Sequence, residues 1–288
     1  MSTISRRDFL AGLGFAGASF ALGGLTRAAE TPARPKRGTD LVPLGRSGLK
    51  TTVLGIGTGT VSGNQQRALG SEGFAKLTRH ALDRGIRYID TADSYQMHVF
   101  VQIALKGVPR EKYFIQTKTT ARTPEVAKAD IERFRRELRV DYLDTLLMHC
   151  MTRDSWPTDM RPVMDVLSEA KAKGRVRAVG ISNHGWEPLV ASVDSDWPDV
   201  QLIRINPFGD KMDGEPGQVA AQIKRLHDKG RGILGMKIFG ETGFDGPQKR
   251  LESLKYVLGL GTVDVFTIGF TSIAQLDETL EMIEQVLA

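Results

Sequence analysis

The sequence predicts an α/β protein whose strand–helix units close into a (β/α)8 TIM barrel. First, short β-branched runs alternate with longer helical patterns eight times between residue 53 and the C-terminus. Second, no long insertion interrupts the alternation, which favours one closed barrel over an open doubly wound sheet with fewer strands. Third, Gly85, Gly174 and Gly230 each stand where a predicted helix stops before a strand, the usual place for a glycine C-cap.

The eight predicted strands and eight predicted helices follow from these runs. The strands span residues 53–57, 86–90, 113–118, 142–148, 176–180, 200–205, 232–237 and 263–268. The helices lie at about residues 72–84, 99–106, 124 onward, 161–173, 186–193, 218–229, 247–258 and 273–286. The third helix has the clearest start, with Thr123 as N-cap and Pro124 at the first helical position. Residues 41–50, ahead of the first strand, are assigned to the barrel domain without an element.

Composition places the chain among ordinary globular proteins and excludes several function classes. Of its 288 residues, 41% are hydrophobic and 25% are charged, which is typical of a soluble domain. The single cysteine, Cys150, rules out an intrachain disulfide. The formal charge is only +5, and no basic run is interleaved with aromatic residues, so we expect no nucleic-acid partner.

The N-terminus predicts an export signal rather than a folded segment. Arg6 and Arg7 are followed by Asp8, by Phe9 and Leu10, and then by an uncharged stretch to Thr26. This pattern is typical of a twin-arginine (Tat) signal peptide, and its five glycines argue against a stable membrane span. The alternative is a tail with two chance arginines. We therefore expect residues 1–29 to be a signal peptide, 30–40 a linker and 41–288 the barrel, with the Tat export machinery as a partner and a periplasmic or exported location.

Three successive predicted strands end in residues that can carry chemistry. Barrel enzymes hold their active sites at the carboxyl ends of the strands. Asp90, Lys118 and His149 stand at or just past three such ends, and Tyr95 follows Asp90 by five residues. The simpler alternative is an ion pair at a strand end with a tyrosine and a histidine packed nearby.

Together these four residue types suit the reduction of a carbonyl group. At an effective dielectric constant near 20, an ammonium about 4 Å away stabilises a phenolate by about 4 kcal/mol. That corresponds to about three pKa units, so Lys118 is expected to make Tyr95 a usable proton donor. Asp90 would hold Lys118 in place, and His149 would orient the carbonyl oxygen towards Tyr95.

Several stretches resemble the aldo-keto reductase superfamily, in order and with its spacing, from about residue 41 to the C-terminus. The most specific is Gly-Ile-Arg-Tyr-Ile-Asp-Thr-Ala-Asp-Ser-Tyr at 85–95; the others lie at 53–58, 115–118, 141–149, 179–183 and 268–278. The resemblance implies that Asp90, Tyr95, Lys118 and His149 form a catalytic tetrad. It also implies a small carbonyl or alcohol substrate and NADP or NAD as the cofactor, NADP being the more usual.

A hydrolytic metal site needs a cluster of histidines and carboxylates at several strand ends, and only His149 stands at such a position, so we expect no metal site. The resemblance further implies a set of cofactor contacts. The expected contacts are Gly57, Thr58, Ser182, Asn183, Met236, Lys237, Gly269, Ser272, Gln275 and Glu278. Met236 stands where many relatives stack an aromatic ring on the nicotinamide. Gly269 and Gln275 replace the lysine and arginine that often hold the 2′-phosphate, so we expect NADPH to be preferred over NADH only slightly.

The remaining expectations concern single residues and an alternative function. We expect His98 to cap or pack the start of its helix, Cys150 to be a small core residue, and Trp156 to help form the substrate pocket. The glycine-rich loop at 240–246 is a candidate for closing over a cofactor. The alternative to an enzyme is an exported barrel that binds or senses a nucleotide without significant turnover. Export favours this alternative, because a compartment outside the cytoplasm is expected to lack a free pool of nicotinamide cofactor.

Overall fold

The computed structural model describes residues 34–241, 243 and 246–288, and the predicted signal peptide lies outside these residues. Eight parallel strands form a closed barrel in the order β10-β3-β4-β5-β6-β7-β8-β9, so the predicted fold class is confirmed. The barrel strands are β3 Leu54–Gly57, β4 Tyr88–Asp90, β5 Phe114–Thr119, β6 Leu143–Met151, β7 Val176–Asn183, β8 Val200–Arg204, β9 Gly232–Met236 and β10 Val265–Ile268.

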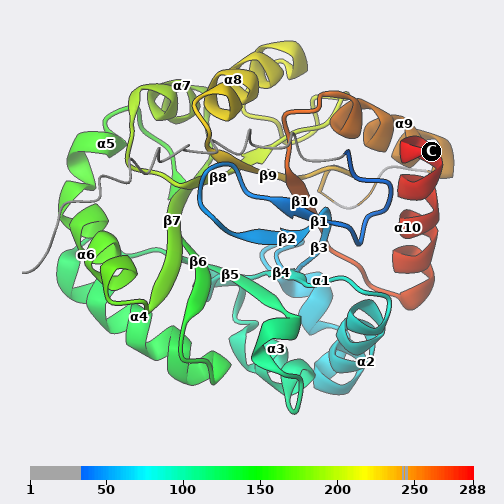
Figure 1. Cartoon of the computed structure of the whole chain (residues 1–288), viewed down its shortest axis with the longest axis horizontal. Helices are drawn as coiled ribbons and strands as arrows, with labels where there is room; N and C mark the ends of the chain where they lie inside the picture. Colours follow the sequence, from blue (N-terminus) through cyan, green and yellow to red (C-terminus); the bar gives the residue numbers. More distant parts are fainter. Residues whose placement is uncertain (1–33, 242, 244–245) are drawn as a thin grey trace, which may run out of the picture. The chain divides into compact units, whose positions relative to one another are not determined.

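Helices surround the barrel as an outer ring (Figure 1). The helix after each strand in turn is α2 Gly70–Asp83, α3 His98–Leu105, α4 Pro124–Leu138, α6 Arg161–Ala172, α7 Trp186–Asp194, α8 Pro216–Asp228, α9 Gly246–Gly259 and α10 Ile273–Leu287. Four short helical elements were not predicted: α1 Asn64–Arg67, α5 Trp156–Asp159 and the 3₁₀ turns η1 Asp93–Tyr95 and η2 Arg110–Lys112. Among the described residues, no helix combines the length and the apolar character needed to cross a bilayer.

The predicted helix boundaries have the local chemistry that the sequence indicated. The Thr123 side chain accepts a hydrogen bond from the Val126 N–H, and a proline follows at the first helical position of α4. Gly85, Gly174 and Gly230 have φ values of +97°, +70° and +78°. Only glycine reaches such angles without strain, so these residues end α2, α6 and α8 and turn the chain into the next strand.

A hairpin that the sequence did not reveal closes the amino-terminal end of the barrel. Strands β1 Leu41–Pro43 and β2 Lys50–Thr52 pair antiparallel and are drawn in blue in Figure 1. Between them, Leu44 and Leu49 are buried in the cluster that fills the barrel interior. The Arg46 N–H donates to the Gly230 carbonyl at 2.8 Å, which ties the hairpin to the turn before β9. Access to the interior is therefore from the carboxyl ends of the strands.

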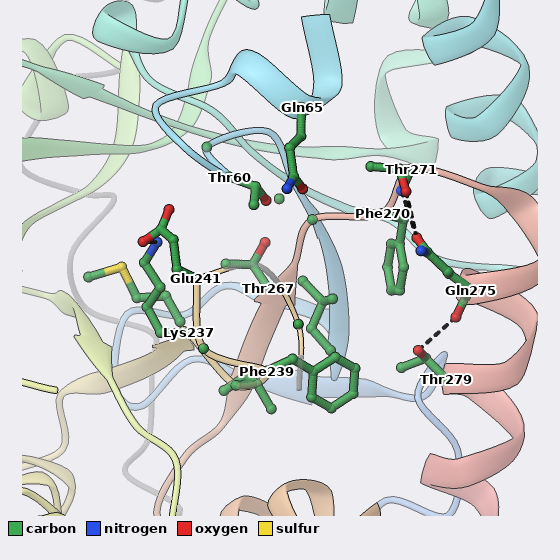
Figure 2. A pocket seen from close by; sticks show the side chains of 18 of the residues that line it. Thr60, Gln65, Lys237, Phe239, Glu241, Thr267, Phe270, Thr271, Gln275 and Thr279 are labelled. Atoms are coloured by element: carbon green, nitrogen blue, oxygen red, sulfur yellow. Dashed lines mark hydrogen bonds and ion pairs between the residues drawn. The ribbon is translucent and has the colours of Figure 1, made fainter. Parts of the chain in front are cut away.

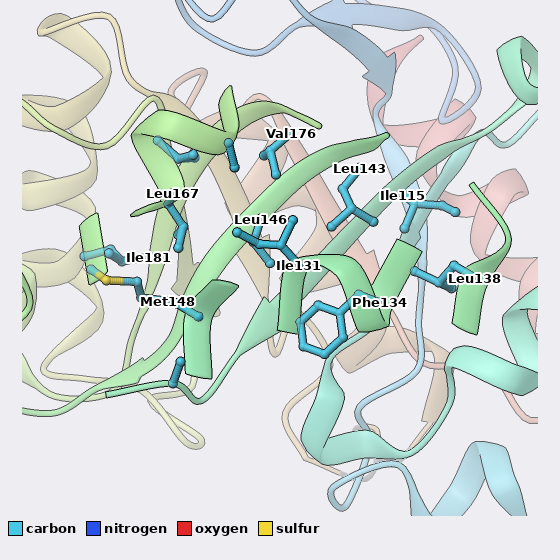
Figure 3. Close-up of a cluster of buried hydrophobic side chains, with 14 of the residues drawn as sticks. Ile115, Ile131, Phe134, Leu138, Leu143, Leu146, Met148, Leu167, Val176 and Ile181 are labelled. Carbon is cyan, nitrogen blue, oxygen red and sulfur yellow. The ribbon is translucent and has the colours of Figure 1, made fainter. Parts of the chain in front are cut away.

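The apolar core between strands and helices follows the period-two pattern of each strand. From β6, Leu146 and Met148 face outward and pack in one cluster with Ile131 and Phe134 of α4 (Figure 3). The intervening Leu147 belongs instead to the interior cluster. Helices thus cover one face of each strand, and the other face is left for the interior and the site at its rim.

Two parts of the chain differ from their sequence-based boundaries. β6 and β7 were predicted to end at Met148 and Gly180, but they run on to Met151 and Asn183, which pair beyond a register shift. The segment expected to be a linker packs on the barrel in part, because the Gly38 carbonyl accepts a hydrogen bond from the Leu54 N–H at 2.8 Å.

Candidate active site

Three neighbouring strands place polar side chains inside the carboxyl rim. Asp90, Lys118 and His149 come from β4, β5 and β6 and are all less than 7% exposed. The Lys118 ammonium donates to Asp90 Oδ1 at 2.6 Å and to the Thr91 carbonyl at 2.8 Å. Gln116, one inward position earlier on β5, donates its side-chain amide to the same Asp90 oxygen at 2.8 Å. Asp90 and Lys118 therefore form a buried ion pair whose orientation is fixed by hydrogen bonds.

Tyr95 completes the group from the 3₁₀ turn η1 Asp93–Tyr95, which directly follows β4. Its hydroxyl lies 3.5 Å from His149 Nε2, and Lys118 Nζ lies 4.8 Å from the centre of its ring. A Cβ atom at Gly59 would come within 2.6 Å of Tyr95 Cζ, so a glycine is needed here to leave room for the ring. The structure thus brings together all four residues that the sequence selected.

Burial, more than the neighbouring lysine, determines the protonation of Tyr95. Removal from water raises the pKa of Tyr95; the Lys118 ammonium opposes this shift and the Asp90 carboxylate adds to it. Burial disfavours the charged form of Lys118, but Asp90 and Tyr95 outweigh it, and the pKa of Lys118 is raised. The expected lowering of the Tyr95 pKa is therefore wrong in this structure, because burial, with a contribution from Asp90, outweighs the charge of Lys118.

His149 is neutral at physiological pH. Burial, followed by the positive charge of Lys118 and the neighbouring His184 and Arg122, lowers the pKa of His149 to about 2. The Ser94 hydroxyl lies 3.3 Å from His149 Nδ1. When Ser94 donates this hydrogen bond, the ring proton is on Nε2, which faces the Tyr95 hydroxyl. A neutral imidazole oriented in this way can donate a hydrogen bond to a carbonyl oxygen.

A cavity of about 430 Å³ begins at this group and extends towards α9 and α10 (Figure 2). Asp90 and Tyr95 line one end, and Glu278 and Thr279 of α10 line the other. Six of the predicted cofactor contacts border the cavity: Gly57, Met236, Lys237, Gly269, Gln275 and Glu278. Thr267 lies in the middle, and its buried hydroxyl has no hydrogen-bond partner among the described residues.

One acidic side chain connects two loops at the edge of the cavity. Glu241, in the loop after β9, accepts a hydrogen bond from Lys237 Nζ at 2.5 Å and another from the Val61 N–H at 2.9 Å. Its own N–H donates to Asp210 at 3.1 Å. Figure 2 shows Lys237 and Glu241 paired beside the cavity, across from Thr60. We call these contacts of Glu241 the loop clasp.

The other four predicted contacts do not border the cavity; they are Thr58, Ser182, Asn183 and Ser272. The Thr58 hydroxyl donates to the Asp90 carbonyl at 3.0 Å. The Asn183 amide donates to Gln201 at 3.0 Å, and its oxygen accepts from Ser192 of α7 at 3.0 Å. Asn183 therefore faces α7, because β7 continues through this residue and alternation turns its side chain outward.

The absence of a lysine at 269 and an arginine at 275 has a structural cause. A Cβ atom at Gly269 would lie 2.0 Å from Thr60 Oγ1, so the loop after β3 fills the space that a side chain would need. Gln275 Oε1 accepts hydrogen bonds from the Thr271 N–H and hydroxyl at 2.9 and 3.0 Å. Ser272 caps α10 by accepting from the Gln275 N–H at 3.2 Å. Gln275 thus helps to close the start of α10.

An ion-pair network outside the barrel holds the turn that carries Tyr95. The Arg133 guanidinium of α4 binds both oxygens of Asp93, at 2.7 and 2.8 Å, and Glu137 at 3.1 Å. His98 bridges Glu137 and the Thr117 hydroxyl at 2.7 and 2.8 Å. Asp93, His98 and Glu137 are close enough together to hold a metal ion, but Arg133 already supplies their positive charge. His98 packs the start of α3, as predicted.

Two single-residue expectations are wrong. Cys150 is only partly buried and has a φ of +61°, because β6 bulges there and the Cys150 N–H donates to the Ser182 hydroxyl at 2.8 Å. Trp156 is 2% exposed within the outer core, and its indole N–H donates to the Pro188 carbonyl at 3.2 Å. It is therefore a core residue and does not border the cavity.

A closed parallel barrel with a Tyr–His pair and a buried Asp–Lys pair at its carboxyl rim is the arrangement that the sequence resemblance implied. The aldo/keto reductase family matches residues 53–211, more than half of the chain. The chain belongs to this family.

Individual relatives agree with the assignment. An aldo-keto reductase from Mycobacterium avium is 30% identical over 190 residues, which cover 62% of this chain and 58% of that protein. A methylglyoxal reductase from Salmonella typhi is 32% identical over 140 residues, 44% of this chain and 50% of that protein. The chain thus spans about half the length of these curated relatives. A Pseudomonas aeruginosa structure titled as an aldo-keto reductase shares the fold, with a TM-score of 0.71, 22% identity, and coverage of 86% of this chain and 95% of that one.

Proposed function

We propose that the chain is an NAD(P)H-dependent oxidoreductase that reduces an aldehyde or ketone to an alcohol, or catalyses the reverse reaction. The observation that carries this proposal is the position of the cavity. It begins at Tyr95 and Asp90 and continues to α10, so an elongated cofactor can lie in it with one end beside a proton donor. Family membership supports the same chemistry.

The residues along the cavity suit a dinucleotide. Gly57, Gly240 and Gly243 border it and let a ligand approach the backbone. The unpartnered Thr267 hydroxyl offers a hydrogen bond at its centre. Met236 and Lys237 would hold the nicotinamide end. When bound, the reduced nicotinamide supplies a hydride to the carbonyl carbon.

The protein residues then manage the carbonyl oxygen and its proton. Since the Tyr95 hydroxyl and His149 Nε2 are 3.5 Å apart, one oxygen atom can accept hydrogen bonds from both. His149 orients this oxygen, and Tyr95 transfers a proton to it as negative charge develops. Lys118 stabilises the tyrosinate that remains, and Asp90 keeps Lys118 charged and in place. We take methylglyoxal as the first substrate to assay, from the name of the Salmonella typhi relative.

The experiment that tests the proposal is the substitution Tyr95→Phe. The rate of carbonyl reduction should fall 10²–10⁴-fold, the usual contribution of a general acid, while nucleotide affinity stays within about twofold. Tyr113→Phe is the matched control, because this half-buried tyrosine lies against Arg110, away from the cavity. Equal rates for Tyr95→Phe and the parent protein would show that Tyr95 is not the acid. A parent protein that binds nucleotide without turnover would favour the binding or sensing alternative.

We also propose that the chain is exported through the twin-arginine route and works outside the cytoplasm. The support is the sequence pattern at residues 5–29. This route carries folded proteins, so a barrel could cross with its nucleotide already bound.

A further inference from the structure

An ion pair borders the cavity where the cavity reaches the outer helices α9 and α10, whereas Tyr95 borders it at the barrel rim. Arg250 of α9 donates from one guanidinium nitrogen to both oxygens of Glu278 on α10, each at 2.9 Å. Both side chains border the cavity and are partly accessible, 25% for Arg250 and 41% for Glu278. The other two guanidinium nitrogens of Arg250 have no hydrogen-bond partner among the described residues.

Among the described residues that border the cavity, Arg250 and Lys237 are the only cations. Lys237 follows β9 and is bound by Glu241, so it belongs to the end near Tyr95. No cation comes from position 269, where Thr60 fills the space, or from position 275, where the residue is a glutamine whose side chain binds Thr271. Any charge-based recognition beside α9 and α10 therefore depends on Arg250 and on the carboxylate that neutralises it.

We propose that the Arg250–Glu278 pair determines whether the protein distinguishes NADP from NAD. This inference rests on the proposed function, which places the nicotinamide at Tyr95 and the adenosine ribose at the opposite end. Arg250 is the cation that would bind a 2′-phosphate, and Glu278 is the acceptor that would bind a free ribose 2′-hydroxyl.

The charges explain why the two cofactors should bind similarly in the parent protein. A 2′-phosphate carries between one and two negative charges at neutral pH. The phosphate is attracted by Arg250 and repelled by Glu278 at a similar distance, so the two contributions to its binding energy nearly cancel. A ribose 2′-hydroxyl is uncharged and can donate to Glu278. Removing either member of the pair should therefore shift the preference, in opposite directions.

The test measures equilibrium binding to the full-length protein, and no turnover is needed. NADPH, NADH, adenosine 2′,5′-bisphosphate and 5′-AMP are titrated into the parent, Arg250→Gln and Glu278→Gln. Glu278→Gln should tighten both 2′-phosphorylated ligands about tenfold relative to their unphosphorylated partners; Arg250→Gln should weaken them by a similar factor, about 1.4 kcal/mol. Both shifts should shrink at high ionic strength. Arg161→Gln, which breaks an exposed ion pair with Asp165 on α6, should change neither ratio.

The outcomes separate this inference from the proposed function. If NADPH and NADH bind but their affinity ratio is unchanged in both variants, the pair does not determine the choice, although the oxidoreductase proposal stands. If the two variants shift the ratio in the same direction, the opposing roles are wrong. If the parent binds none of the four ligands, both proposals fail. Opposite shifts in the two variants, absent from Arg161→Gln, support the inference even where one variant is less stable.

Discussion

His149 is buried beside positive charges that disfavour its protonation, and this makes the stability of the protein depend on pH. The pKa of His149 is about 2 in the folded protein, against about 6.5 in an unfolded chain. Below pH 6.5 the unfolded state therefore binds a proton that the folded state does not. Acidification from pH 6.5 to 4 should lower the free energy of unfolding by up to about 1.4 kcal/mol per pH unit from this residue.

The measurement compares urea unfolding of the parent and His149→Gln at several pH values. Burial raises the pKa of Asp264 to about 6, so this residue stabilises the folded state on acidification and opposes the effect of His149. Because Asp264 is present in both proteins, the difference between them isolates the contribution of His149. The parent should lose more stability than the variant as the pH falls. Parallel curves would mean that His149 is protonated in the folded protein.

At the residue scale, the sequence predicted the side chains whose positions follow from regular alternation along a strand. It did not predict the side chains whose positions depend on a local irregularity such as a bulge. Asp90 and Lys118 occupy regular inward positions, so their meeting at the rim was predictable. Cys150 was placed in the core by the same rule, but the bulge in β6 turns it towards the Ser182 hydroxyl. Arg250 gave no signal, because nothing in a helix sequence shows which exposed arginine will face a cavity.

The turn that carries Tyr95 is held from outside the barrel, by Arg133 of α4 on Asp93. Arg133→Met should let this turn move and thereby misplace the Tyr95 hydroxyl, with a loss of about tenfold in kcat and little change in nucleotide affinity. Arg135→Met is the matched control, because Arg135 pairs with Glu132 on the same helix. Steady-state kinetics measure both variants. Equal losses would indicate a general effect on α4 and would contradict a specific role for Arg133.

The loop clasp should determine how long a nucleotide stays bound. Glu241 binds Lys237 from its own loop and the Val61 N–H from the loop after β3. These hydrogen bonds must therefore break before the edge of the cavity can open. Glu241→Ala should raise the dissociation rate about tenfold, with a smaller effect on association. Dilution of nucleotide-loaded protein, followed by fluorescence, gives the rate. An unchanged rate would show that the clasp does not limit release.

At the scale of elements, helices with a strong start signal were predicted closely, and short pieces were missed. Thr123 and Pro124 define the start of α4 in both sequence and structure. By contrast, α1 and α5 each contain only four residues, too few for a helical period to show in the sequence. β1 and β2 have three residues each and depend on contacts with the distant Gly230 turn, which no local pattern reports.

The export proposal is a property of the whole molecule and is tested in cells. Replacing Arg6 and Arg7 with lysine should abolish twin-arginine transport and leave the full-length protein in the cytoplasm. Fractionation followed by immunoblotting measures the distribution, and the purified variant should bind nucleotide as the parent does. Equal export of both proteins would show that the two arginines are not a transport signal.

The hairpin at the amino-terminal end of the barrel delays the completion of folding. Its contacts join residues near position 45 to the turn near 230, and β3 pairs with β10 at the other end of the chain. Such contacts between distant residues slow folding, because a long loop must close before they form. All four residues of the Tyr–Lys–Asp–His group have been synthesised by position 149, yet the barrel that holds them cannot close until the ribosome has passed residue 268. Folding to the closed barrel therefore waits for the synthesis of β10, however early the four residues of the site are made.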